Sequence, residues 1–111
     1  MIRAKIRRES DTKRITGFRI EGHALFANRG NDIVCAGVSA VTVGTVNSVE
    51  AVAGVKLTVR MEEGLLHADV PKSVSETQQS SLQLLLESMV VMLQTIEESY
   101  GKHIRLEQYY E

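Results

Sequence analysis

The segment from Asp32 to Ala53 constrains the fold most, because it carries no charge between Ile33 and Val49 and is rich in Gly, Ala, Ser and Thr. Its many Val and Thr residues favour a strand. The segment is nevertheless far longer than a typical strand of roughly 5–6 residues, and its small residues recur at helical spacing. We therefore predict a buried helix, capped by Asp32 and ended by Gly54, that lies close against a sheet or a second helix.

Alternating apolar and polar residues predict strands on both sides of this helix. Ile2, Ala4 and Ile6 alternate with basic residues, as expected for a strand with one face in water. Similar patterns predict further strands over 15–21, 55–61 and 66–70, with a hairpin turn at 62–64, and a short final strand over 104–108.

A long amphipathic helix is predicted after Pro71. Ser73 and Glu76 match a capping box, and Gly101 is expected to end the helix. One face collects apolar side chains: Leu82, Leu85, Leu86, Met89, Leu93, Ile96 and Tyr100, with Met92 also expected in the core. The resulting order, ββαββαβ, predicts an α+β fold in which two helices pack on one face of a mainly antiparallel sheet.

Composition limits the class of protein. The 111 residues fit one domain, 1–111, with 43% hydrophobic and 24% charged residues. A net charge of -1 provides no field that would attract nucleic acid, so we expect no direct nucleic-acid partner. The single cysteine excludes an internal disulfide and suits a reducing cytoplasm. The uncharged stretch looks too weakly apolar to span a bilayer, and no signal peptide is evident, so we expect no membrane association.

The position of Cys35 suggests chemistry. If Asp32 is the N-cap, Cys35 lies in the first turn of the helix, where the macrodipole favours the thiolate, the nucleophilic form. The unpaired N–H groups of that turn could also stabilise an oxyanion. His23 ends the second strand, and a strand end and a helix start can meet at one edge of a sheet. An imidazole there could hold the thiolate as an ion pair and later protonate a leaving amine.

Less specific interpretations remain open at this point. A lone cysteine is more often a small core residue than a nucleophile, and a lone histidine after a strand is usually a surface residue. Ser39, one turn after Cys35, could bond to its own helix or help to shape the site. His67 and His103 are expected on strand surfaces. Zinc needs three or four ligands, so one cysteine and three scattered histidines predict neither a metal nor another cofactor.

Two motifs resemble a known family. Gly22-His23-Ala24, followed by Gly30-Asn31-Asp32-Ile33-Val34-Cys35-Ala36-Gly37-Val38-Ser39-Ala40, is similar to the signature of the Prp-type ribosomal-processing cysteine proteases. The resemblance covers essentially the whole chain. It implies that His23 and Cys35 are the catalytic pair and that Asp32 and Ser39 occupy the family's conserved acidic and serine positions. Gly37 departs from the pattern, in which Ala is usual at this position.

The resemblance also implies a function. Such a protease removes the short N-terminal extension of large-subunit ribosomal protein number twenty-seven in bacteria, cutting after Phe-Phe and before Ala, and acts as a homodimer. A pocket for the Phe is then expected beside Cys35, with Leu25 and Phe26 as candidate walls. Two alternatives stay open: a non-catalytic ribosome-assembly or binding protein with a buried Cys35, and a thiol-dependent enzyme of another substrate class, such as a transferase.

Overall fold

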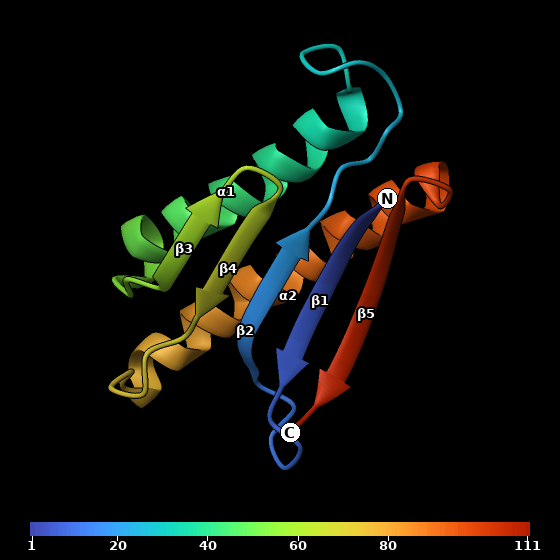
Figure 1. The fold of residues 1–111 in the computed structure, drawn as a ribbon. Helices are drawn as coiled ribbons and strands as arrows, with labels where there is room; N and C mark the ends of the chain where they lie inside the picture. Colours follow the sequence, from blue (N-terminus) through green and yellow to red (C-terminus); the bar gives the residue numbers. More distant parts are fainter.

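The computed structural model describes residues 1–111 and places two helices beside a five-stranded sheet (Figure 1). The strand order in the sheet is β3-β4-β2-β1-β5. Neighbouring strands are antiparallel except β1 and β5, which are parallel. In chain order, the elements are β1 (Ile2–Arg8), β2 (Ile15–Glu21), α1 (Ile33–Ala53), β3 (Thr58–Glu62), β4 (Leu65–Asp69), α2 (Glu76–Tyr100) and β5 (Ile104–Tyr110). The predicted α+β architecture and element order are confirmed.

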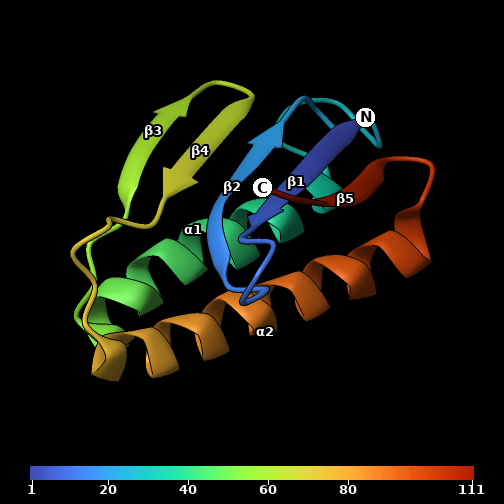
Figure 2. The same ribbon diagram turned by 90° about the horizontal axis from the view of Figure 1, so that it is seen from below.

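Both helices cover the same face of the sheet (Figure 2). The alternation in β1 determines which side chains face them: Ile2, Ala4 and Ile6 are buried, whereas the residues between them are not. The 21 buried apolar residues of the sheet and the helices form one cluster. The small residues of α1 do not form the predicted close contact, because Ala36 and Ala40 are exposed and a Cβ at Gly37 would meet Ile96 of α2 at an ordinary contact distance of 3.8 Å.

Three predictions about these elements need correction. Strand β3 begins at Thr58 instead of Val55, because its partner β4 ends at Asp69 and the next residue, Val70, donates to Thr16 of β2. The final strand is longer than predicted, because β5 pairs with β1 along its whole length. Met92 is 42% exposed and therefore does not belong to the core.

The N-terminus of α2 also differs from the prediction. The capping box is formed by Ser75 and Gln78, not by Ser73 and Glu76. Both pairs fit the same spacing, so the sequence pattern does not separate them. The register observed leaves Glu76 in the first turn, where it forms an ion pair with Arg14 at 2.7 Å.

Helix α1 meets the criteria of length and composition for a helix that could cross a membrane, contrary to our expectation from its small residues. Core helices of soluble proteins meet the same criteria. One face of α1 is buried within this fold, through Val34, Val38, Thr42, Thr45, Val49 and Ala53.

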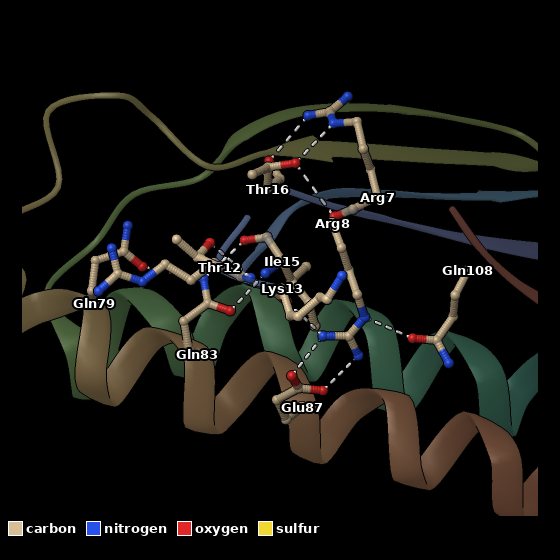
Figure 3. Close-up of polar contacts among 11 residues, drawn as sticks. Arg7, Arg8, Thr12, Lys13, Ile15, Thr16, Gln79, Gln83, Glu87 and Gln108 are labelled. Atoms are coloured by element: carbon tan, nitrogen blue, oxygen red, sulfur yellow. Dashed lines mark hydrogen bonds and ion pairs between the residues drawn. The ribbon is translucent and has the colours of Figure 1, made fainter. Parts of the chain in front are cut away.

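A buried arginine joins the sheet to α2 (Figure 3). Arg8 is only 8% exposed, and its guanidinium donates two hydrogen bonds to the Glu87 carboxylate, at 2.6 and 2.7 Å. It also donates to Gln108 of β5 at 2.8 Å and to the Lys13 carbonyl at 2.9 Å. Arg7 extends to the opposite side of the sheet, where it contacts Thr16. Arg8 therefore ties together β1, β5, α2 and the β1–β2 turn.

We expect Glu87→Gln to lower the free energy of unfolding by about 1–2 kcal/mol at pH 7, because Arg8 would lose its charged acceptor while Glu87 itself is half exposed. Hydrogen bonds from Arg8 are the main cause that lowers the pKa of Glu87. A carboxyl whose pKa is lower in the folded state contributes stability above its ordinary pKa of about 4.3 and loses it as the pH falls through the lower folded value.

Urea unfolding of the wild type and Glu87→Gln between pH 7 and pH 3 tests this expectation, since the difference between the two proteins should shrink towards pH 3. Glu76→Gln is the matched control on the same helix, because its ion pair with Arg14 is exposed and should matter less. If the two substitutions lower the free energy of unfolding equally at pH 7, the contact of Glu87 with Arg8 stabilises the fold no more than the exposed ion pair does.

Candidate active site

Cys35 lies in the first turn of α1, as predicted. Asp32 is the N-cap residue, with an extended backbone, and its Oδ1 accepts hydrogen bonds from the N–H groups of Val34 and Cys35, both at 3.0 Å. The side chain of Cys35 is half-buried, and its thiol is free. Cys35 is therefore not fully buried, as the non-catalytic alternative supposed, although it packs against the core.

Asp32 also organises the loop that precedes the helix. Its second oxygen, Oδ2, accepts from the N–H of Phe26 at 2.9 Å and from that of Ala27 at 3.3 Å. These bonds, and first of all the one from the Cys35 N–H, lower the pKa of Asp32. Both carboxylate oxygens are thus engaged by backbone, and Asp32 forms no hydrogen bond with His23.

Most of the oxyanion donors that we expected in the first turn already have acceptors, and only the N–H of Ile33 forms no hydrogen bond. Asp32 holds the N–H groups of Val34 and Cys35 with its carboxylate and that of Ala36 with its carbonyl, at 3.0 Å. A different N–H points to the sulfur: Ala24 donates to Cys35 Sγ at 3.4 Å. The backbone beside His23, and not the helix turn alone, therefore supplies a donor at the thiol.

The Gly22-His23 pair has a structural explanation at the end of β2. Gly22 has a φ of 91°, and any Cβ there would collide with the Met1 carbonyl oxygen. Its N–H donates to the carbonyl of Gly64, in the turn between β3 and β4, at 2.9 Å. A Cβ at Gly64 would lie 2.9 Å from His23 Nε2. Gly64 therefore lets the hairpin turn lie against the imidazole of His23, and Gly22 lets the end of β2 pass close to Met1.

His23 and Cys35 line the same cavity of about 530 Å³. Its wall also includes Leu25, Asp32 and Ser39. A second, adjoining cavity of about 220 Å³ is again lined by His23, Cys35 and Ser39. No hydrogen bond joins His23 to Cys35 in this structure. The sequence-predicted pair thus lines one cavity, although no direct contact joins the two side chains.

The supporting residues separate into two groups. Ser39 faces both cavities, and its hydroxyl forms no bond with its own helix, in contrast to Thr42, which donates to the Val38 carbonyl. Leu25 lines the larger cavity and is 76% exposed. Phe26 does not line it: its ring packs edge-on against Tyr100 at 5.5 Å and against His103 at 5.2 Å. The structure therefore separates the two predicted pocket walls.

Sequence reasoning missed three contributors to this region. The sequence indicated only a turn at Gly64 and not its contact with His23. Arg29 and Glu63, both on the larger cavity, form an ion pair at 2.7 Å between the loop and the hairpin, a pairing with no sequence signature. His103, expected on a strand surface, is half-buried and contacts Ala24. No group of three or more His, Cys, Asp or Glu side chains is placed to hold a metal ion.

Asp32→Asn should separate the two tasks of this side chain. Asn caps helices as well as Asp does, so we expect the N–H groups of Val34 and Cys35 to keep their acceptor. The amide has only one oxygen, so the N–H groups of Phe26 and Ala27 should lose theirs. Hydrogen exchange measured by NMR should therefore accelerate at residues 26 and 27 and stay slow at 34 and 35. Asp32→Ala, the control, should release both pairs, and unchanged exchange at residue 26 in Asp32→Asn would contradict this account.

Known proteins match this chain along most of its length. The family model for the cysteine protease Prp matches residues 1–105. The chain is 43% identical over 108 residues to the ribosomal processing cysteine protease Prp of Bacillus subtilis strain 168, covering 96% of each protein. It is 38% identical over 97 residues to the protein of the same name from Staphylococcus aureus strain Mu50, covering 87% of this chain and 90% of that protein.

Solved structures of the same family also superpose on this chain. The chain superposes with a TM-score of 0.87 and 35% identity on the S. aureus ribosomal processing protease Prp in complex with a covalently linked product peptide. The TM-score is 0.82, with 34% identity, for the S. aureus protease in complex with a substrate peptide. In both cases 98% of this chain and 100% of the other are covered. On matches of this extent, the chain belongs to the cysteine protease Prp family.

Proposed function

We propose that this protein is a cytoplasmic, single-domain endopeptidase that removes the N-terminal extension of large-subunit ribosomal protein number twenty-seven, with Cys35 as nucleophile and His23 as base. The observation that carries the proposal is the shared cavity of thiol and imidazole, with the Ala24 N–H directed to the sulfur. The names of the relatives, ribosomal processing cysteine proteases, support the substrate class. The peptides bound to the S. aureus enzyme support a peptide substrate.

The proposed reaction assigns one step to each of these groups. The Cys35 thiolate attacks the peptide carbonyl, a C–S bond forms, and the C–N bond then breaks as His23 gives its proton to the leaving amine. Water, deprotonated by His23, hydrolyses the thioester and releases the new carboxylate and the thiol. The Ala24 N–H, beside the sulfur, is the nearest candidate to stabilise the oxyanion.

The charges near Cys35 act in opposite directions. The first turn of α1 and the Ala24 N–H present positive partial charge to the sulfur. The Asp32 carboxylate, which accepts from the N–H of Cys35 itself, places a negative charge beside it. The role proposed for His23 is to take the proton of the thiol and later to give it to the leaving amine.

The cavity wall favours an apolar residue before the cut. Leu25, Ala27 and Ala36 supply apolar surface beside Cys35, and a volume of about 530 Å³ leaves room for a Phe side chain. Phe26 would have to leave Tyr100 and His103 to join this wall. Leu25 is therefore the better candidate for direct contact with the substrate, and Phe26 would act by anchoring the loop.

A peptide that carries Phe-Phe-Ala tests the proposal. The wild type should cut it after the second Phe, as read by mass spectrometry, whereas Cys35→Ala and His23→Ala should abolish or nearly abolish the cleavage. Burial of a Phe side chain is worth roughly 1.5–3 kcal/mol, so a peptide with Ala before the cut should react about ten- to a hundredfold more slowly. If Cys35→Ala still cleaves the peptide, Cys35 is not the nucleophile. If the two peptides are cleaved at equal rates, there is no pocket specific for Phe.

We further propose that the protein is a homodimer. The outer side of α2 exposes apolar residues on one stripe, with Leu84 72% and Val91 59% exposed, and Met92 lies beside them. This surface is not covered by α1 or the sheet. A second copy is the simplest partner for it, in line with what the resemblance implies.

Light scattering at micromolar concentration should give twice the 12.3 kDa mass of one chain. Substitution of both Leu84 and Val91 by Glu should reduce the mass to that of a monomer, because two charges would be buried without partners. Met61→Glu is the control, since Met61 is 56% exposed on β3, away from α2, and should leave the mass unchanged. A monomeric wild type would contradict the dimer, and a dimeric double variant would exclude this stripe as its interface.

A further inference from the structure

His103 lies in the turn between α2 and β5, and its backbone is held on both sides. Its N–H donates to the Tyr100 carbonyl at 2.8 Å, and its own carbonyl accepts from the Ile2 N–H at 2.9 Å. This turn and the β2–α1 loop lie at the same end of the molecule, the upper end in Figure 1. The residue is therefore fixed by the end of one helix and the start of β1, in reach of the loop that contains His23.

The imidazole of His103 contacts this loop in two ways. Its Nδ1 lies 2.9 Å from the Ala24 carbonyl oxygen. A carbonyl can only accept, so Nδ1 carries the proton and donates. The ring also packs edge-on against Phe26, which in turn contacts Tyr100. His103 thus holds the loop through one hydrogen bond and one aromatic contact.

Ala24 connects this contact to the thiol. Its carbonyl accepts from His103, while its N–H donates to Cys35 Sγ at 3.4 Å. The next residue, Leu25, has a φ of 56°, a conformation that residues other than glycine rarely adopt. Leu25 is followed by Phe26, whose N–H is held by Asp32. A strained residue is therefore clamped between two hydrogen bonds, one to His103 and one to Asp32.

We propose that His103 is a positioning residue for the reaction: by fixing the Ala24 carbonyl, it keeps the Ala24 N–H directed to the Cys35 sulfur and Leu25 directed into the cavity. The inference rests on the proposed function of Cys35 but concerns a residue that does not itself line either cavity of the site. Small displacements of a group that contacts the reacting atoms are costly, because catalysis depends on preorganised donors.

Two substitutions separate the hydrogen bond from the packing. His103→Asn keeps a donor nitrogen at the same number of bonds from Cα as Nδ1 but loses the ring. His103→Phe keeps a ring against Phe26 but loses the donor. We expect kcat for the Phe-Phe-Ala peptide to fall at least tenfold in His103→Phe and His103→Ala and to stay within about threefold of wild type in His103→Asn, with KM changed less than kcat. The alkylation rate of Cys35 by iodoacetamide at pH 7 should follow the same order.

The outcomes are distinguishable. Wild-type kcat in His103→Phe, or a loss in His103→Asn as large as in His103→Ala, would overturn the proposal while leaving Cys35 and His23 as the proposed catalytic pair. A wild type whose cleavage does not depend on Cys35 would instead overturn the proposed function. Thermal unfolding of each variant identifies losses that come from misfolding, and if His103→Ala does not fold, the comparison of His103→Asn with His103→Phe still decides.

Discussion

The site depends on one carboxylate. Asp32 accepts four backbone hydrogen bonds, two from the first turn of α1 and two from the loop before it. A helix N-terminus leaves N–H groups without partners inside the helix, and an acidic side chain is well suited to satisfy them. Because the same side chain also holds the loop, the position of Cys35 is coupled to the positions of Phe26 and Ala27. Asp32 thus fixes the backbone around Cys35, but it also leaves a negative charge beside the thiol.

The remaining parts of the site come from segments far apart in the chain. His23 follows β2, the turn at Gly64 lies against its imidazole, and His103 reaches Ala24 from the turn after α2. The glycines are required where these segments approach closely: at Gly22 by the Met1 carbonyl and at Gly64 by the ring of His23. The proposed active site thus lies where strand ends, a hairpin turn and two helix ends meet.

Helix α2 links this site to the hydrogen bonds around Arg8. Near the opposite end of the sheet, Glu87 and Gln83 on α2 hold Arg8 and Ile15 (Figure 3). At its C-terminal end, Tyr100 contacts Phe26 and supports the turn that carries His103. Between these ends, α2 buries Leu82, Leu86, Met89, Val90 and Leu93 in the common core. The groups that stabilise the helix–sheet contact are therefore separated from those that line the cavity at Cys35.

Local patterns in the sequence predicted the order of the elements and the place of Cys35 in the first turn of α1. The period of two in β1, the Asp32 cap and the stop at Gly54 involve residues only a few positions apart, so they are visible without a fold. The motifs around His23 and Cys35 identified the family. Local spacing did not decide between the two capping boxes, because Ser73 and Ser75 fit equally well.

Only the tertiary structure decided which backbone N–H reaches the sulfur of Cys35. It also decided that Leu25 lines the cavity while Phe26 packs against Tyr100, and that His103 contacts the loop. These contacts join residues that are distant in sequence, such as His103 and Ala24. Their geometry depends on the parallel pairing of β5 with β1 and on the packing of α2, which local propensity does not encode.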